Sequence, residues 1–301
     1  MSAAALRRAM LALAALLIVW GGVALLRRSS SDAPIALALP KLSAADIDRI
    51  AITGAGDSIE LKSTASGWTA NGYAAAAGAV DDLIGALSDS GSASELVARS
   101  AASHARMAVD SAAGRRMRFF KGDRVLADLI VGTRGASYQS AYVRQAGADE
   151  VYLFRGRLTG LAGKDLDAWR DRRMAAVPAD SVRTVEVTRG KQRWTLSRAD
   201  GTWRLGAEAA DSAAVAGLLQ RMGDVTALEF ATDAQADSLD FAHPARALTV
   251  LGAHNDTLLH LVFDSAATGA WVRRAAGGPV FRLDFWRADQ LTPADSTLRK
   301  K

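Results

Sequence analysis

The 301-residue chain contains no cysteine. It therefore has no disulfide bond, no thiol nucleophile and no thiolate metal site. No cysteine follows the apolar segment near its start, which excludes a lipoprotein. This composition fits a periplasmic domain that folds without disulfides.

The short motifs that mark common catalytic sites are also missing. The sequence has no GxSxG nucleophile motif and no HExxH zinc motif. The stretch "GAGDSI" (54–59) lacks the third glycine and the strand-to-helix setting of a nucleotide-binding loop, so we interpret it as a hairpin turn. Asp81 and Asp82 are adjacent on a predicted helix, and such neighbours point in different directions rather than forming an acid/base pair. We predict no catalytic residue and no cofactor site, and we expect that the protein is not an enzyme.

Histidines are few and lie far apart. The four are His104, His243, His254 and His260. His254 and His260 lie on two sides of a predicted turn, and we interpret them as a surface pair because zinc normally takes three or four protein ligands. We predict no metal site here.

The stretch "DLDAWRDRR" (165–173) brings three aspartates together. A calcium loop that began at Asp165 would need glycine and glutamate where Arg170 and Ala176 stand. We expect local ion pairs instead, with Trp169 buried. The charged residues of these pairs are Asp165, Asp167, Asp171, Arg170, Arg172 and Arg173.

Outside its first segment the chain has almost no excess of positive charge. Four of the 37 basic residues lie in residues 1–28, which contain no acidic residue, so the other 33 basic residues stand against 32 acidic ones. Arginines beside an apolar segment contact lipid headgroups. Nucleic-acid binding normally needs a basic face, so we expect no nucleic-acid partner.

What is present is one long apolar run, residues 9–26. Its 18 uncharged residues would span about 27 Å as a helix, enough to cross a bilayer core. A cleaved signal peptide would have a shorter apolar region and a small-residue cleavage site, whereas this run ends in "LLRRSS". We predict an uncleaved signal anchor in contact with the bilayer. Arginine pairs flank it equally, and a long C-terminal domain can translocate regardless of nearby charge. We therefore expect a single-pass protein of the inner (cytoplasmic) membrane with most of its chain in the periplasm.

The rest of the chain aligns with itself. Apolar positions of the first half have apolar partners 135 positions later. Ile50, Ile52, Leu61, Trp68, Val80, Leu83 and Leu87 align with Val185, Val187, Leu196, Trp203, Val215, Leu218 and Met222. Later pairs, such as Tyr142 with Trp271 and Val151 with Val280, keep the order at a slightly smaller offset. Changes in loop length between two copies of one domain would produce this drift.

The residue pattern of each copy predicts three strands, then an amphipathic helix, then four more strands. In the first copy the strands are 47–53, 58–63, 67–70, 116–122, 124–132, 140–145 and 150–156, and in the second 182–188, 193–198, 202–205, 247–252, 257–263, 270–275 and 279–284. The helices carry apolar stripes at Val80, Leu83, Ile84 and Leu87, and at Val215, Leu218, Leu219 and Met222.

We therefore predict an α+β fold: an N-terminal transmembrane helix followed by two tandem, repeated, mainly antiparallel β domains, each with one packed amphipathic helix. The predicted parts are a membrane anchor (1–28), a linker (29–42), a first repeat domain (43–163), a connector (164–176), a second repeat domain (177–290) and a C-terminal tail (291–301).

Several longer motifs resemble those of a known family. The anchor, "ADLIVG" (127–132), "AYVRQAGADEVYLF" (141–154) and "DLDAWRDRR" followed by "VRTVEVTRG" (182–190) resemble the bacterial domain of unknown function 4340 (DUF4340). The resemblance covers nearly the whole chain after the anchor. It implies a membrane-tethered, β-rich protein, often encoded near ABC-type transporters of the gliding-motility kind, without defined catalytic residues. The stretch "FWRADQLTPADSTLRKK" (285–301) departs from "DLDAWRDRR", which indicates that the latter is a connector between domains.

These features together predict a non-catalytic, membrane-anchored binding or scaffolding module outside the cytoplasm. We expect a protein partner in the envelope, such as a component of an ABC-type transporter or of a cell-envelope assembly. Two alternatives stay open. One is an envelope hydrolase with an inter-domain site, and the other is a cell-wall glycan binder that uses Tyr138, Tyr142 or Trp271 as stacking surfaces.

The two tryptophans of "RTVEVTRGKQRWTLSRADGTWRL" (183–205) are interpreted as parts of the fold. Trp203 aligns with Trp68, so we expect it to be buried between helix and sheet, and its replacement by alanine would then cost about 3–5 kcal/mol. Trp194 aligns with Ile59 and needs only an apolar strand position. The matched positions of Tyr142 and Trp271 likewise favour packing over a stacking surface.

Overall fold

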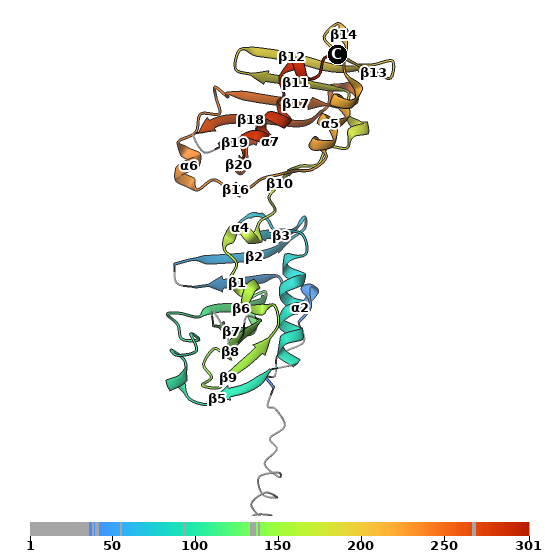
Figure 1. Cartoon of the computed structure of the whole chain (residues 1–301). Helices are drawn as coiled ribbons and strands as arrows, with labels where there is room; N and C mark the ends of the chain where they lie inside the picture. The colour runs from blue at the N-terminus through green and yellow to red at the C-terminus, as the bar shows by residue number, and fades with distance from the viewer. Residues whose placement is uncertain are drawn as a thin grey trace, which may run out of the picture. The chain divides into compact units, whose positions relative to one another are not determined.

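The computed structural model describes residues 36, 37, 39, 42–54, 56–92, 94–132, 137, 139–266 and 269–300 (Figure 1). Residues 9–26, the predicted membrane anchor, and Tyr138 lie outside these ranges. Among the residues that are described, no helix has the length and apolar character needed to cross a membrane. The described fold is α+β, with two large sheets built from antiparallel pairings.

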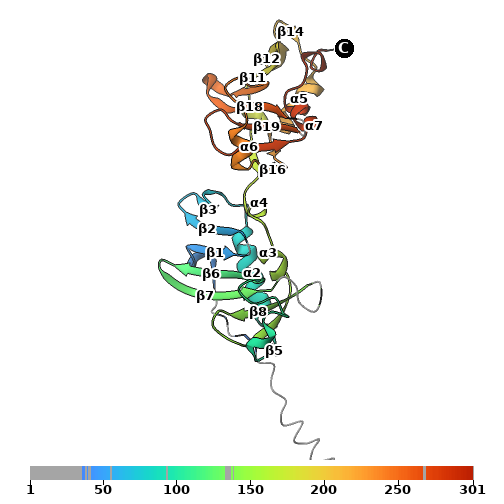
Figure 2. The ribbon, with the colours of Figure 1, turned by 90° about the vertical axis from the view of Figure 1, so that its left-hand side faces the viewer.

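The first sheet has the strand order β4-β3-β2-β1-β6-β7-β8-β9-β5. Its strands are β1 (Arg49–Thr53), β2 (Ser58–Thr64), β3 (Gly67–Ala70), β4 (Tyr73–Ala74), β5 (Glu95–Ala98), β6 (Arg115–Lys121), β7 (Arg124–Val131), β8 (Ser140–Gln145) and β9 (Val151–Arg155). Helix α2 (Ala79–Ser92) lies across the strands (Figure 2) and buries the predicted apolar stripe of Val80, Leu83, Ile84 and Leu87. Two short helices, α3 (Leu158–Ala162) and α4 (Leu166–Trp169), follow β9.

The second sheet has the order β14-β13-β12-β11-β17-β18-β19-β20-β16. Its strands are β11 (Thr184–Arg189), β12 (Gln192–Ala199), β13 (Thr202–Leu205), β14 (Glu208–Ala209), β16 (Glu229–Phe230), β17 (Arg246–Leu251), β18 (Thr257–Ala266), β19 (Gly269–Arg274) and β20 (Phe281–Leu283). Helix α5 (Ser212–Met222) buries Val215, Leu218, Leu219 and Met222. The shorter helices are α6 (Asp233–Asp237) and α7 (Phe285–Leu291), and β10 (Arg173–Ala175) pairs with β15 (Val225–Thr226) in a separate small sheet.

Numbered from the first strand of each sheet, the two orders are identical. The predicted three strands, long helix and four strands are present in both halves. Each sheet also has two short strands that were not predicted, β4 and β5 in the first and β14 and β16 in the second. The prediction of one helix per domain was incomplete, because α7 also packs into the second core through Ala288 and Leu291. A strand of two residues, such as β14, and a helix of seven residues, such as α7, are too short to show the period of their type in the sequence.

By internal packing the chain divides into two compact units. One consists of the residues up to Glu60 together with Val80–Gly163, and the other of Leu61–Ala79 together with Lys164–Lys301. The domain boundaries given above from the sequence stay a prediction.

Each unit has a second, smaller core on the sheet face away from its long helix. In the second unit Phe241, Val262 and Trp271 form this core. In the first unit it consists of Val109, Ile130 and Val151, with Tyr142 packed against it. The packing predicted for Tyr142 and Trp271 is confirmed, because both matched aromatics contribute to these cores rather than to an exposed surface.

The two tryptophans of the second unit differ from each other. Trp194 is buried, as an apolar strand position requires, and its Nε1 also donates a hydrogen bond to the carbonyl of Pro293 at 3.1 Å. Trp203 packs against the core as predicted, but it is only partly buried, which is less than we expected from its alignment with Trp68. It lies on β13, next to the sheet edge, where the fully core-facing residue is Leu205. The cost of Trp203→Ala is accordingly below the range for buried tryptophan.

The connector and the tail occupy equivalent positions, contrary to the sequence interpretation. Ala75 forms an isolated antiparallel bridge with Arg170, and Ala210 forms the same kind of bridge with Arg299. The residues just before the two arginines, Trp169 and Leu298, are both buried. Their side chains differ in size and their sequences share little, so the equivalence depends on backbone pairing and is invisible in a comparison of residues.

Candidate functional site

The four histidines lie apart, as far as the described residues show. His104 shares a hydrogen bond through Nε2 with the carbonyl of Asp149, and His243 Nδ1 lies 2.9 Å from Asp240 Oδ2. His254 is in the turn after β17, and His260 is on β18 opposite Thr249. The part of the chain that the structure describes contains no group of three or more potential metal-ligating side chains.

The aspartates of the connector bind neighbouring groups. Asp165 caps α4 by accepting a hydrogen bond from the amide of Ala168, while Asp167 pairs with Arg170 and Asp171 with Arg173. The predicted local ion pairs and the burial of Trp169 are therefore confirmed. Arg172 differs from the prediction, because its Nη1 donates to the carbonyl of Leu228.

The other candidate motifs are ordinary parts of the fold. In "GAGDSI" the amide of Gly54 donates to the carbonyl of Asp57, which closes the turn between β1 and β2 as predicted. Asp81 and Asp82 are exposed on α2. Neither feature is built as a catalytic or nucleotide-binding site.

Among the residues that the structure describes, the largest exposed aromatic side chain is on α7, which the sequence interpretation treated as part of a tail. Asp284 accepts a hydrogen bond from the amide of Arg287 and so begins this helix. Ala288 and Leu291 face the core, which leaves the first turn facing solvent. Phe285 is 43% exposed there and Trp286 is 67% exposed. Exposed large apolar side chains beside a hollow mark interaction sites more often than scattered single ones do.

Helix α7 is held on the sheet by an ionic cluster. Asp289 pairs with Arg189 at 2.9 Å and also with Arg246. Thr292, just after the helix, is buried; its carbonyl accepts a hydrogen bond from Arg189 and its hydroxyl accepts one from Arg246. These arginines come from β11 and β17, at the centre of the sheet. By binding Asp289 and Thr292 they hold α7, and with it Trp286, in place on the sheet.

Two adjoining hollows lie between α5 and α7. One measures about 180 Å³ and the other about 360 Å³, and Arg221, Trp286 and Gln290 line both. We call the pair the α5–α7 groove. Its remaining lining residues are Ala213, Ala214, Gly217, Leu218, Asp224, Val225, Thr226, Leu283, Arg287, Asp289, Leu291, Pro293, Thr297 and Leu298.

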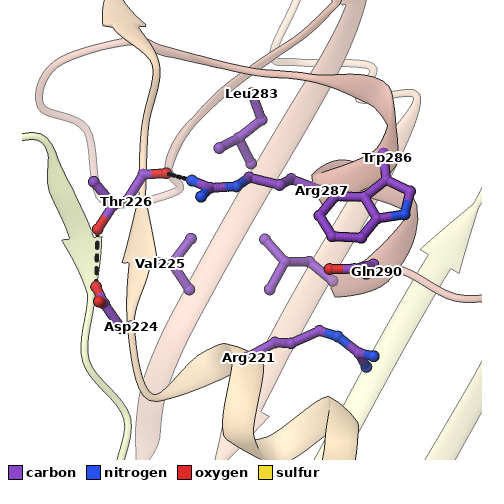
Figure 3. A pocket seen from close by; sticks show the side chains of 9 residues that line it. Arg221, Asp224, Val225, Thr226, Leu283, Trp286, Arg287 and Gln290 are labelled. Carbon is purple, nitrogen blue, oxygen red and sulfur yellow. Dashed lines mark hydrogen bonds between the residues drawn. The ribbon is translucent and has the colours of Figure 1, made fainter.

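One end of the groove is braced by polar contacts (Figure 3). Arg287 Nη1 donates to the carbonyl of Thr226 at 2.6 Å, and the hydroxyl of Thr226 donates to Asp224 Oδ1 at 2.8 Å. Figure 3 shows Trp286 and Gln290 on the α7 side of the hollow and Arg221 on the α5 side. The groove thus combines apolar surface with guanidinium, carboxylate, carboxamide and indole groups, a set that can hold a ligand through apolar and polar contacts.

Comparison with known proteins places the chain in a family. The family described as "Domain of unknown function (DUF4340)" matches this chain over residues 69–244, more than half of its length. The chain belongs to the DUF4340 family. No curated protein and no solved structure matches it. Helix α5 lies within the DUF4340 match and α7 lies beyond it, so the groove is formed only in part by the matched segment.

Sequence reasoning missed the groove. Trp286 and Gly217 come from segments far apart in the chain, and no motif links them. The one local signal was "DFWRADQL" (284–291), an aspartate cap before two consecutive aromatics, which predicts a short helix with an aromatic first turn.

Proposed function

We propose that this DUF4340 protein is a non-catalytic docking module, tethered to the inner membrane through residues 9–26, whose α5–α7 groove binds a protein partner in the periplasm. The observation that carries the proposal is the exposure of Trp286 beside an apolar hollow, on a helix that the Asp289 cluster holds in place. Tryptophan and arginine are the residues most enriched at the energetic centres of protein interfaces.

The family resemblance indicates where to seek the partner. Genes of this family often lie near ABC-type transporters of the gliding-motility kind, so a transporter component or another envelope assembly protein is the partner we propose. The finer description of the fold, a transmembrane anchor followed by two copies of one domain, belongs to the same proposal. The identical strand order of the two sheets supports the duplication.

The alternatives gain no support from the residues that they would use. A glycan platform that includes Tyr142 and Trp271 conflicts with the packing of both side chains in the smaller cores. The hydrolase alternative names no residues of its own, and Asp81 and Asp82, the adjacent carboxylates considered above, are exposed on α2.

Site-specific photo-crosslinking tests the docking function. A benzophenone amino acid replaces Trp286 in the full-length chain, expressed in the native membrane, and Val125 serves as the control position because it is also exposed, at 47%, but lies on β7. We expect a discrete crosslinked protein from position 286 that is absent from position 125. Equal adducts from both positions, or none from 286, would refute the proposal.

A further inference from the structure

We infer that the partner segment in the α5–α7 groove is a short acidic stretch of protein that carries one large apolar side chain. This inference rests on the docking function proposed above and adds the chemistry of the partner. It follows from the apolar floor of the groove and from the state of the charged groups around it.

The floor of the larger hollow accepts an apolar side chain. Leu218 and Leu298 lie at its base, and Ala213, Ala214 and Gly217 form its α5 wall. Gly217 adds no side chain to this wall, and the guanidinium of Arg221 lies over it, with Nη1 3.4 Å from the place that a Cβ would take. A side chain inserted here would be sandwiched between α5 and the exposed indole of Trp286, the arrangement of an anchor residue in an interface pocket.

Around the groove the aspartates have hydrogen-bond or ion-pair partners, whereas the arginines have no ion-pair partner among the described residues. Asp289 is paired with two arginines, and Asp224 accepts a hydrogen bond from Thr226. Arg221 and Arg287 form no ion pair with any residue that the structure describes, although both are exposed. Arg287 is partly committed to the carbonyl of Thr226, and Arg221 lines both hollows. A carboxylate near the apolar anchor would therefore bind Arg221 first, as a charge-assisted hydrogen bond.

Two other classes of ligand fit the groove less well. Binding to an anionic bilayer would need an amphipathic helix that lies in the membrane surface, and α7, with seven residues, is too short to form one. A neutral glycan would stack on Trp286 but would leave Arg221 without a counter-charge.

A peptide selection tests the inference. The full-length chain in nanodiscs is used to select from a random dodecapeptide library, and peptides that also bind Trp286→Ala are removed. We expect the remaining peptides to share aspartate or glutamate on either side of one large apolar residue. Their affinities are then measured by fluorescence anisotropy.

Charge exchange makes the test specific. Arg221→Glu should weaken an acidic peptide at least tenfold, whereas Arg204→Glu, the same change at an exposed position on β13, should leave its affinity unchanged. A peptide with lysine in place of its acidic residues should regain affinity for Arg221→Glu. Thermal melts of the three variants establish that each is folded.

The outcomes separate this inference from the proposed function. Peptides that depend on Trp286 but lack acidic residues, or an unchanged affinity for Arg221→Glu, would overturn the acidic partner and leave docking intact. Absence of any Trp286-dependent peptide overturns the inference, and if crosslinking from position 286 also fails, the docking function falls with it. Retention on peptidoglycan that depends on Trp286, without such peptides, would assign the groove to a glycan.

Discussion

The two halves of the chain have the same sheet but opposite arrangements beside the long helix. Strand pairing sets the equivalence: Tyr142 lies opposite Leu153 and Trp271 lies opposite Arg282, so Arg157 corresponds to Trp286. On the helix, the alignment of α2 with α5 makes Asp82 the counterpart of Gly217. In the first half Arg157 Nη1 forms an ion pair with Asp82 Oδ1 at 3.5 Å. In the second half the corresponding residues are Trp286, whose indole is exposed, and Gly217, which has no side chain.

A second position of the long helix also differs between the two halves. Ala86 on α2 is buried, and its counterpart on α5, Arg221, is exposed and lines the groove. The elements that the two halves share maintain each core, while the positions compared here, at which the halves differ, open a surface in the second half. The comparison teaches that the residues to examine for function are those that the two copies do not share.

The largest effect should come from positions that the copies do share. Leu83→Ala and Leu218→Ala remove nearly fully buried side chains at equivalent places, and each should cost about 2–5 kcal/mol of unfolding free energy. Urea denaturation followed separately for each unit measures both. A cost below 1 kcal/mol for either variant would contradict the claim that both long helices seal a core in the same way.

A smaller loss is expected from Asp289→Ala, which removes the common partner of Arg189 and Arg246. Because the carboxylate is about half exposed, we expect a loss of about 1 kcal/mol. The cluster lies within the second unit, so the unfolding transition of the first unit should not move. Asp289→Asn, which keeps one oxygen acceptor, should recover part of the loss and part of the crosslinking from position 286.

The ion pair of the first half should contribute less than the cluster of the second. Arg157 and Asp82 are both largely exposed, and such pairs contribute about 0–1 kcal/mol. Arg157→Ala should therefore change the denaturation midpoint only slightly. A loss above 2 kcal/mol would show that this pair locks the first half closed and that the contrast with the groove is structural rather than functional.

The sharpest test of the comparison is to build the Arg157–Asp82 ion pair of the first half at the corresponding positions of the second half. The double variant Gly217→Asp, Trp286→Arg should abolish crosslinking of a partner, measured from a probe at Gln290. Gly217 has room for a Cβ, since the nearest outside atom is Arg221 Nη1 at 3.4 Å. An Asp at this position stands one turn before Arg221, so stability should rise by about 0.3 kcal/mol. Partner crosslinking at the parental level would separate the groove from docking.

The smallest effect concerns the bridge between the tail and β14. A hydrogen bond from Arg299 holds the pKa of Asp295 below its usual range. Because folding lowers this pKa, the stabilisation is present above the pKa of the unfolded chain and is lost as the pH falls through the folded value. Arg299→Gln should return the Asp295 pKa to its usual range in an NMR titration. The pKa of Asp240, which a hydrogen bond with His243 lowers, should stay unchanged in the same spectra.

Sequence patterns could reveal the elements that bury a repeated stripe. Leu83 and Leu218, and the strands around Ile52 and Val187, were predicted because apolar residues recur at the spacing that burial demands. How deeply a given side chain is buried was harder to predict from the sequence. Trp203 has the parity of a core residue, but its strand lies next to the sheet edge, a fact that depends on strand order rather than on local sequence.

The groove could not be predicted in the same way. Its features are an absent side chain at Gly217 and an uncovered one at Trp286, and both gain meaning only when two segments distant in sequence become neighbours. The ionic cluster that fixes α7 likewise joins Asp289 to β11 and β17. Only the aspartate cap and the aromatic pair at the start of α7 left a local trace.

The strands that border the two sheets have a consequence for self-association. Each sheet ends in strands of only two to four residues, namely β4 and β5 in one and β14 and β16 in the other. Such short borders offer few unpaired backbone groups to a strand from another molecule, so the sheets resist self-association and templated aggregation. A protein that must hold a specific partner without gathering unspecific ones benefits from this, because its side chains, and not its backbone, then select what binds.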